Sequence, residues 1–245
     1  MDAVIKALIL LFVLIELVYL ASCIVSIQRV LKYKNTTAEI RILANSTILF
    51  LSSCILGSIA HNFQTIIGEK LALPFFILFL VVEILYLVTI SRIALENPRV
   101  KTSLCALLLS SLLFIPYLAT KKWTGFSFYP LFAYESLIAT SISFAFFLQL
   151  GDEKNIKNVF EDPKAIIMLG LFFCYSIPFA YNSVMAAINL IDENFYAKIM
   201  ASKYDKVLLT SISRVGTICY LILNIFIYKA FECKTQTQVG ISLER

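Results

Sequence analysis

The chain has 245 residues, of which 60% are hydrophobic and 15% are charged, and its formal net charge is +5. A typical soluble domain is about 45–50% apolar and about 25% charged, so this composition excludes an ordinary soluble protein. The lysines and arginines flank the apolar runs, where they orient helices, and this placement argues against a nucleic-acid partner.

Seven apolar stretches are each long enough to cross a lipid bilayer, which takes roughly 20 residues in a helix. Inside lipid, a helix satisfies its own backbone polar groups. The sequence therefore predicts an all-α membrane protein, a bundle of seven transmembrane helices within residues 1–232, followed by a short tail at 233–245. The helices are expected at about 4–27, 42–60, 71–90, 103–119, 131–150, 165–188 and 207–231. The first stretch is too long for a signal peptide, so we expect it to be retained.

Prolines and basic residues support this division of the chain. Pro98, Pro130 and Pro163 come just before the fourth, fifth and sixth stretches, where the first helical amides lack partners. Most basic residues fall on one side of the predicted bundle: Arg29, Lys32, Lys34, Arg41, Arg92, Arg99, Lys101, Lys154, Lys157, Lys164, Lys229, Lys234 and Arg245. The positive-inside rule places that side in the cytoplasm, so the N-terminus is expected outside and the C-terminus inside.

Motifs for catalysis, metals and cofactors are missing from the sequence. The six cysteines fall almost entirely inside predicted helices and suit small core residues better than disulfides. His61 is the one histidine, which excludes a histidine-rich metal site. There is no nucleophile elbow and no glycine-rich phosphate loop. We expect no metal and no cofactor, and the sequence favours a protein that is not an enzyme.

Ionisable residues inside the predicted helices are the natural candidates for function, because each costs about 2.5–3.5 kcal/mol to insert. At 1.5 Å per residue, Glu135 lies about 6 Å and Arg214 about 10 Å below the outer edge of the membrane. These similar depths predict an ion pair between Arg214 and Glu135. Glu16 and Glu83 lie deeper, near the midplane, and are candidate proton sites.

Polar side chains accumulate in the outer half of the predicted bundle. Tyr181 and Asn182 follow Pro178, which predicts a kink that can act as a hinge. These side chains either line a ligand pocket or join neighbouring helices by hydrogen bonds. The candidate ligand-binding residues are Glu135, Arg214, Tyr181, Asn182, Glu83 and His61.

Two of the predicted helices share a weak internal repeat. One contains Glu83-Ile-Leu-Tyr-Leu-Val-Thr-Ile-Ser91 and the other Glu135-Ser-Leu-Ile-Ala-Thr-Ser-Ile-Ser143, so a glutamate and a serine coincide eight residues apart. Parallel repeats of this kind are found in some transporters.

Three short motifs carry a resemblance to a known group of proteins. They are Val82-Glu83-Ile84, Tyr134-Glu135-Ser136 and Glu161-Asp162-Pro163, the last followed by Tyr175. With the short basic tail, they resemble small, uncharacterised bacterial seven-helix membrane proteins, which are similar to the membrane sensor region of some histidine kinases. The chain departs from that pattern at Lys164-Ala165, where an aromatic pair is expected. The resemblance implies a bacterial inner-membrane protein that senses without a kinase of its own.

Several functions remain open from the sequence. The leading hypothesis is a sensor that binds a small ligand in the outer half of the bundle and signals to a membrane or cytoplasmic protein partner. The first alternative is a small-molecule or proton-coupled transporter, with Glu16 and Glu83 as proton sites. The second is a membrane subunit of a larger complex. The lipid bilayer itself is a partner in all three.

Overall fold

The computed structural model describes residues 2–32, 37–67, 69–113, 129–152, 162–191 and 214–232, with side chains at 7–32, 37–60, 74–113, 129–151, 162–188 and 214–232. The labelled helices are α1 (Asp2–Leu31), α2 (Ala38–Ile67), α3 (Glu69–Ala94), α4 (Pro98–Ser110), α6 (Tyr129–Asp152) and α7 (Pro163–Ile191). A 3₁₀ turn, η1 (Ser111–Leu113), continues α4. The last described helix, Arg214–Glu232, is called the C-terminal helix below.

Six of these helices are long and apolar enough to cross a membrane. Their candidate spans are Ala7–Leu31, Ala38–Ala60, Pro74–Ala94, Tyr129–Gly151, Pro163–Ile188 and Arg214–Glu232. The chain is therefore a multi-pass membrane protein built as a helical bundle. The predicted crossing at 103–119 starts earlier, at Pro98, and residues 114–119 lie outside the described part of the chain, so this crossing stays a prediction.

Two helices begin at the prolines from which the sequence predicted a helix start. Pro98 is the first residue of α4, and the Asn97 side chain accepts the backbone N–H groups of Arg99 at 3.0 Å and Val100 at 3.3 Å. Pro163 is the first residue of α7. These contacts satisfy backbone donors that have no partner inside the helix.

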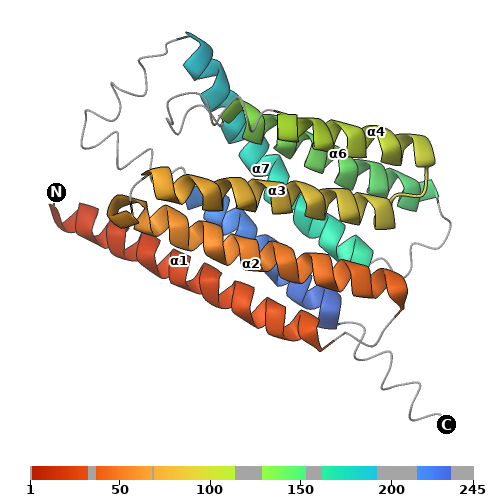
Figure 1. Ribbon diagram of the computed structural model, residues 1–245, viewed down its shortest axis with the longest axis horizontal. Coiled ribbons are helices and arrows are strands. Elements are labelled where there is room, and N and C mark those ends of the chain that lie inside the picture. The colour runs from red at the N-terminus through yellow and green to blue at the C-terminus, as the bar shows by residue number, and fades with distance from the viewer. Residues whose placement is uncertain are drawn as a thin grey trace.

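Consecutive helices in Figure 1 lie side by side and run in alternating directions. Neighbours in sequence pack together: α2 contacts α1 and α3, α4 contacts α3 and α6, and α6 packs along α7. The C-terminal helix packs against helices from both halves of the chain and is partly exposed, as at Ile218 and Ile225. Its Asn224 bonds to α1, its Tyr220 bonds to α3, and its Phe226 lies against Gly170 of α7. It therefore joins elements from both halves of the chain.

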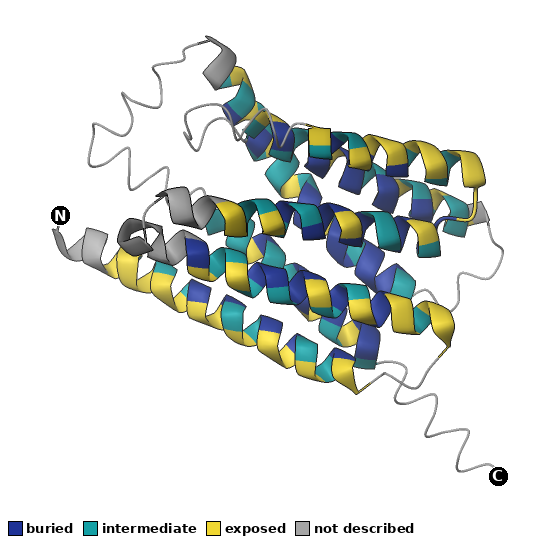
Figure 2. Cartoon of the chain, in the orientation of Figure 1, coloured by how far each residue is buried: buried dark blue, intermediate teal, exposed yellow. Residues whose placement is uncertain are grey.

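Burial separates an apolar core from an apolar outer surface. The core includes Ile84, Leu87, Ile142 and Leu223, each 0% exposed. Large apolar side chains on the outside of α1 and the other helices remain exposed, and Figure 2 shows these residues along the outer faces of the bundle. An outer surface of this kind suits contact with lipid chains.

One end of the bundle gathers basic side chains. The ends of α1 and α3 and the start of α2, α4 and α7 meet there with the end of the C-terminal helix (Figure 1). This basic end carries Arg29, Lys32, Arg41, Arg92, Arg99, Lys101, Lys164 and Lys229. In the same view α1 begins at the opposite end of the bundle. The assignment of the basic end to the cytoplasm stays a prediction of the positive-inside rule.

Candidate functional site

Arg214 forms an ion pair with Glu16, and the predicted pair with Glu135 is wrong. The guanidinium Nη1 of Arg214 lies 2.6 Å from Oε2 of Glu16 on α1, and the Ser58 hydroxyl of α2 donates to Oε1 of the same carboxylate. The two charged side chains are 16% and 11% exposed. The prediction failed because depth along a helix says nothing about the face on which a side chain lies.

Glu83 lies in the middle of α3 and is 1% exposed. Its Oε1 accepts the hydroxyl of Tyr175 from α7 at 2.5 Å and also the hydroxyl of Tyr220 from the C-terminal helix. Two phenol donors on one oxygen stabilise a carboxylate more than an uncharged acid. This contact joins three helices at one buried acidic group.

Glu135 of α6 shares the interior with Glu83. It is 2% exposed, and its Oε1 has no hydrogen-bond partner in the part of the chain that the structure describes. Leu131, one turn before Glu135 on α6, packs against Leu80, one turn before Glu83 on α3. Because α3 and α6 run in the same direction (Figure 1), the two carboxyls lie at neighbouring positions of the bundle. We call Glu83, Glu135, Tyr175 and Tyr220 the carboxyl centre. The ion pairs within the described residues leave both of its glutamates without a basic partner.

Aromatic rings from four elements surround Tyr220. The distances between ring centroids are 6.1 Å to Phe79, 6.4 Å to Phe50, 6.4 Å to Tyr175 and 6.5 Å to Tyr19. The Phe79 and Tyr175 rings meet the Tyr220 ring edge to face. The carboxyl centre therefore has acidic groups and electron-rich rings next to one another.

The other predicted ligand-binding residues are only partly brought together. The Tyr181 hydroxyl lies 3.1 Å from that of Tyr129, and their rings meet edge to face. Asn182 is buried at 8% exposure. The His61 side chain lies outside the described residues. Pro178 lies inside α7, three residues after Tyr175 of the carboxyl centre.

Some of the buried polar groups hold helices together. The Asn224 amide donates to Ser22 Oγ at 2.8 Å and to Cys23 Sγ at 3.1 Å, both on α1. The Ser26 hydroxyl donates to the backbone carbonyl of Asn224 at 3.2 Å. Sequence analysis did not select Asn224, although an amide in an apolar run is the signal that points to such a contact.

The repeated glutamate–serine pattern buries the same two positions in α3 and α6. Ser91 and Ser143 are both 0% exposed, like the nearly buried glutamates that precede them. Each serine donates to the carbonyl four residues earlier, Leu87 at 2.5 Å and Ala139 at 3.2 Å. The two stretches therefore bury the same two positions of their repeat.

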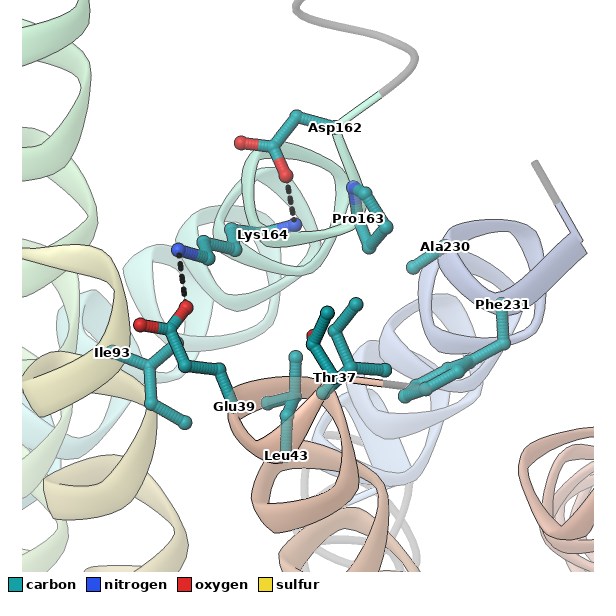
Figure 3. A pocket seen from close by; sticks show the side chains of 10 residues that line it. Thr37, Glu39, Leu43, Ile93, Asp162, Pro163, Lys164, Ala230 and Phe231 are labelled. Atoms are coloured by element: carbon teal, nitrogen blue, oxygen red, sulfur yellow. Dashed lines mark hydrogen bonds and ion pairs between the residues drawn. The ribbon is translucent and has the colours of Figure 1, made fainter. Parts of the chain in front are cut away.

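A small cavity of about 190 Å³ opens at the basic end, as Figure 3 shows. Thr37, Glu39, Asp162 and Lys164 line it with apolar side chains of α2, α3 and the C-terminal helix. Lys164 Nζ lies 3.4 Å from Glu39 Oε2, but these side chains are 32% and 69% exposed. Water screens a pair of this kind, so it contributes little to stability.

Within the side chains that the structure describes, no three His, Cys, Asp or Glu residues are grouped as a metal site requires. The five described cysteines are free and buried. The carboxyl centre is therefore the candidate site on which an argument about function rests. No protein-family model, curated protein or solved structure matches this chain.

Proposed function

We propose that the protein is a membrane carrier that couples the movement of a small solute to the movement of protons. The observation that supports it is the carboxyl centre, where Glu83 and Glu135 lie together and Oε1 of Glu135 has no hydrogen-bond partner. Two ionised carboxylates in an apolar interior are costly without positive charge nearby. A proton or a cationic solute supplies that charge.

The depth of the carboxyl centre suits a carrier. Glu83 is nine residues from the start of the span Pro74–Ala94, and Tyr175 is twelve residues from the start of Pro163–Ile188. At 1.5 Å per residue these positions lie about 14 Å and about 18 Å into the membrane, counted from opposite ends of the bundle. Glu135, six residues from the start of the span Tyr129–Gly151, lies about 9 Å in, nearer the end where α6 begins. Carriers place their sites near this midplane, because one site then serves both sides in turn.

Charge neutralisation gives the coupling. When Glu135 and Glu83 together carry two negative charges, the helices that hold them keep the centre enclosed with a cation. When protons replace the cation, the centre loses its charge and a rearrangement of the helices costs less. Pro178 in α7 is placed to bend near Tyr175 during such a rearrangement. We place the basic end in the cytoplasm, as the positive-inside rule predicts, and the bacterial source follows the resemblance alone.

Proteoliposomes test the carrier. The purified chain is reconstituted with a pH-sensitive dye inside, the membrane potential is held at zero, and amines, amino acids, sugars and nucleosides are added outside in turn. One class of solute is expected to change the internal pH, and Glu135→Gln is expected to abolish that change. Glu96→Gln is the matched control, because Glu96 is an exposed carboxyl in the connection between α3 and α4. If no solute class moves protons in the wild-type chain, the carrier proposal is wrong.

A second candidate function is sensing, which the resemblance to kinase sensor regions also suggests. The observation that favours it is the position of Pro178 three residues after Tyr175, which donates to Glu83. A change at Glu83 can then alter the bend of α7 and so move its basic end. A sensor changes conformation on binding a ligand without any flux in the proteoliposomes, and this result separates the two functions.

A further inference from the structure

Among the described residues, Oε1 of Glu135 is an acceptor without a hydrogen-bond donor. Glu135 is 2% exposed and lies one turn after Leu131, which packs against Leu80, one turn before Glu83. Glu83 in turn accepts the hydroxyls of Tyr175 and Tyr220. A buried acceptor without a donor costs free energy, so native proteins rarely keep one without a reason. Here the missing group is a hydrogen-bond donor, and the charge of the centre favours a positive one.

The chemistry around this acceptor narrows the kind of cation. Hard metal ions take six or more oxygen ligands, or a compact set of carboxylates and carbonyls. The described residues offer two carboxyls together with the rings around Tyr220. Electron-rich rings attract ammonium groups through cation–π interactions. An ammonium group also donates hydrogen bonds, which a bare metal ion cannot do.

The burial of the carboxyl centre also limits the size of the ligand. The cavity described at the basic end is lined by other residues and does not include the carboxyl centre. Three of its four residues are buried, Glu83 at 1%, Glu135 at 2% and Tyr175 at 3% exposure, and Tyr220 is half-buried. A ligand that fits there without large repacking is no bigger than a few heavy atoms.

We propose that the carboxyl centre binds a small ammonium ion, ammonium itself or a short alkylammonium, between Glu135 and Glu83, in competition with protons. This inference rests on the proposed carrier function and names its substrate class. The ammonium N–H groups donate to Oε1 of Glu135, and the rings of Tyr220 and its neighbours stabilise the positive charge. Because protons and the ammonium ion occupy the same carboxyls, transport is an exchange of one for the other.

The groups that face Glu83 decide how binding depends on pH. They are Cys54 from α2, Cys174 and Tyr175 from α7, Tyr220 from the C-terminal helix and Glu135 from α6. Thiols and phenols are mostly uncharged between about pH 5 and pH 8, with reference pKa values of about 8.5 and about 10. The two carboxyls are then the groups that gain protons as the pH falls, and ammonium binding is expected to weaken with acidification.

The test is direct binding of radiolabelled methylammonium to the purified full-length chain in lipid nanodiscs. Wild type and Glu96→Gln are expected to bind it equally, and Glu135→Gln to bind it at least about tenfold more weakly, since one charge-assisted contact is worth at least that factor. Unlabelled ammonium is expected to displace the probe, whereas equal concentrations of sodium and potassium are not. Equal binding by Glu135→Gln, or equal displacement by sodium or potassium, overturns the inference.

A second measurement uses the wild-type chain alone and does not depend on whether a variant folds. Methylammonium affinity is measured from about pH 8 to about pH 5, a range in which methylammonium itself stays charged. A fall of at least about tenfold is expected, and a constant affinity contradicts the competition with protons. If another solute drives proton movement in proteoliposomes but methylammonium does not bind, the proposed carrier function is kept and the proposed substrate class is wrong. If methylammonium binds but no solute moves protons, the proposed ammonium site is kept and the proposed carrier function is wrong.

Discussion

Arg214 and Glu16 are 198 positions apart in sequence and lie 2.6 Å apart in the folded chain. Their ion pair joins α1 to the C-terminal helix, so it holds the first and last described helices of the bundle together. Glu16 and Glu83, both carboxyls in apolar helices, therefore have different surroundings. Glu16 has a basic partner, whereas Glu83 and Glu135 share a centre without a described one.

Loss of one partner of this ion pair is expected to destabilise the protein more than loss of both. Arg214→Met leaves the Glu16 carboxylate largely buried and without its guanidinium, and we expect a loss of up to about 3–5 kcal/mol in the free energy of unfolding. The double variant Arg214→Met/Glu16→Gln is expected to recover most of that loss, because no unpaired charge remains. Unfolding by sodium dodecyl sulfate in mixed micelles measures the free energy of unfolding of the single and the double variant. A double variant no more stable than Arg214→Met would contradict this expectation, because removal of the unpaired charge would then recover nothing.

The amide of Asn224 is expected to give a modest and measurable coupling to Ser22. Interhelical hydrogen bonds in membrane proteins average about 0.6 kcal/mol in double-mutant cycles. We expect Ser22→Ala and Asn224→Leu to show a coupling free energy of about that size in the same unfolding measurement. Ser141→Ala is the matched control, because Ser141 donates at 2.8 Å to the carbonyl of Leu137 in its own helix. It is expected to show no coupling with Asn224→Leu.

The sequence predicted the helices well and their contacts poorly, for a physical reason. Hydropathy reports which residues avoid water, and a run of about 20 apolar residues suffices to locate a membrane helix. Helix ends extended beyond the prediction, as in α2 (Ala38–Ile67), because polar residues remain helical beyond the hydrocarbon. The partner of Arg214 depends on how helices are rotated and packed, and neither depth nor hydropathy carries that information.

The sequence likewise predicted some residues of the candidate site and missed others. Glu83 and Glu135 were selected because each is a carboxyl in an apolar run, and the structure places both in one buried centre. Tyr220 was not selected, because a tyrosine is common in membrane helices and its role appears only when its hydroxyl reaches Glu83. Tyr181 was selected for its position after Pro178, but its hydroxyl bonds to that of Tyr129, the first residue of α6.

The orientation of the bundle gives a prediction that needs no assumption about function. Glu96 lies at the basic end, and Pro130 lies near the start of α6 at the opposite end (Figure 1). Both residues are exposed. If the basic end is cytoplasmic, a membrane-impermeant maleimide should label Pro130→Cys in intact cells and Glu96→Cys only after the membrane is opened. Labelling of Glu96→Cys in intact cells, with Pro130→Cys protected, would reverse the orientation.

Gly170 permits the close approach of α7 to the C-terminal helix, and we expect Gly170→Ala to disturb it. A Cβ atom at this position would lie 2.6 Å from Cβ of Phe226 and 3.1 Å from Cδ1 of Leu223. Because Cβ of Phe226 is fixed to the backbone, a change of rotamer cannot relieve the contact, and the two helices must separate.

The expected loss for Gly170→Ala is about 1–3 kcal/mol in the free energy of unfolding, the usual cost of adding a methyl group to a packed core. Gly216→Ala is the matched control, because a Cβ there meets nothing within 4 Å. That control is expected to gain up to about 1 kcal/mol, since alanine favours a helix over glycine. Opposite signs for two identical substitutions would locate the effect in the packing of α7 against the C-terminal helix. Equal effects would mean that helix propensity decides both and that these helices are not closely packed at Gly170.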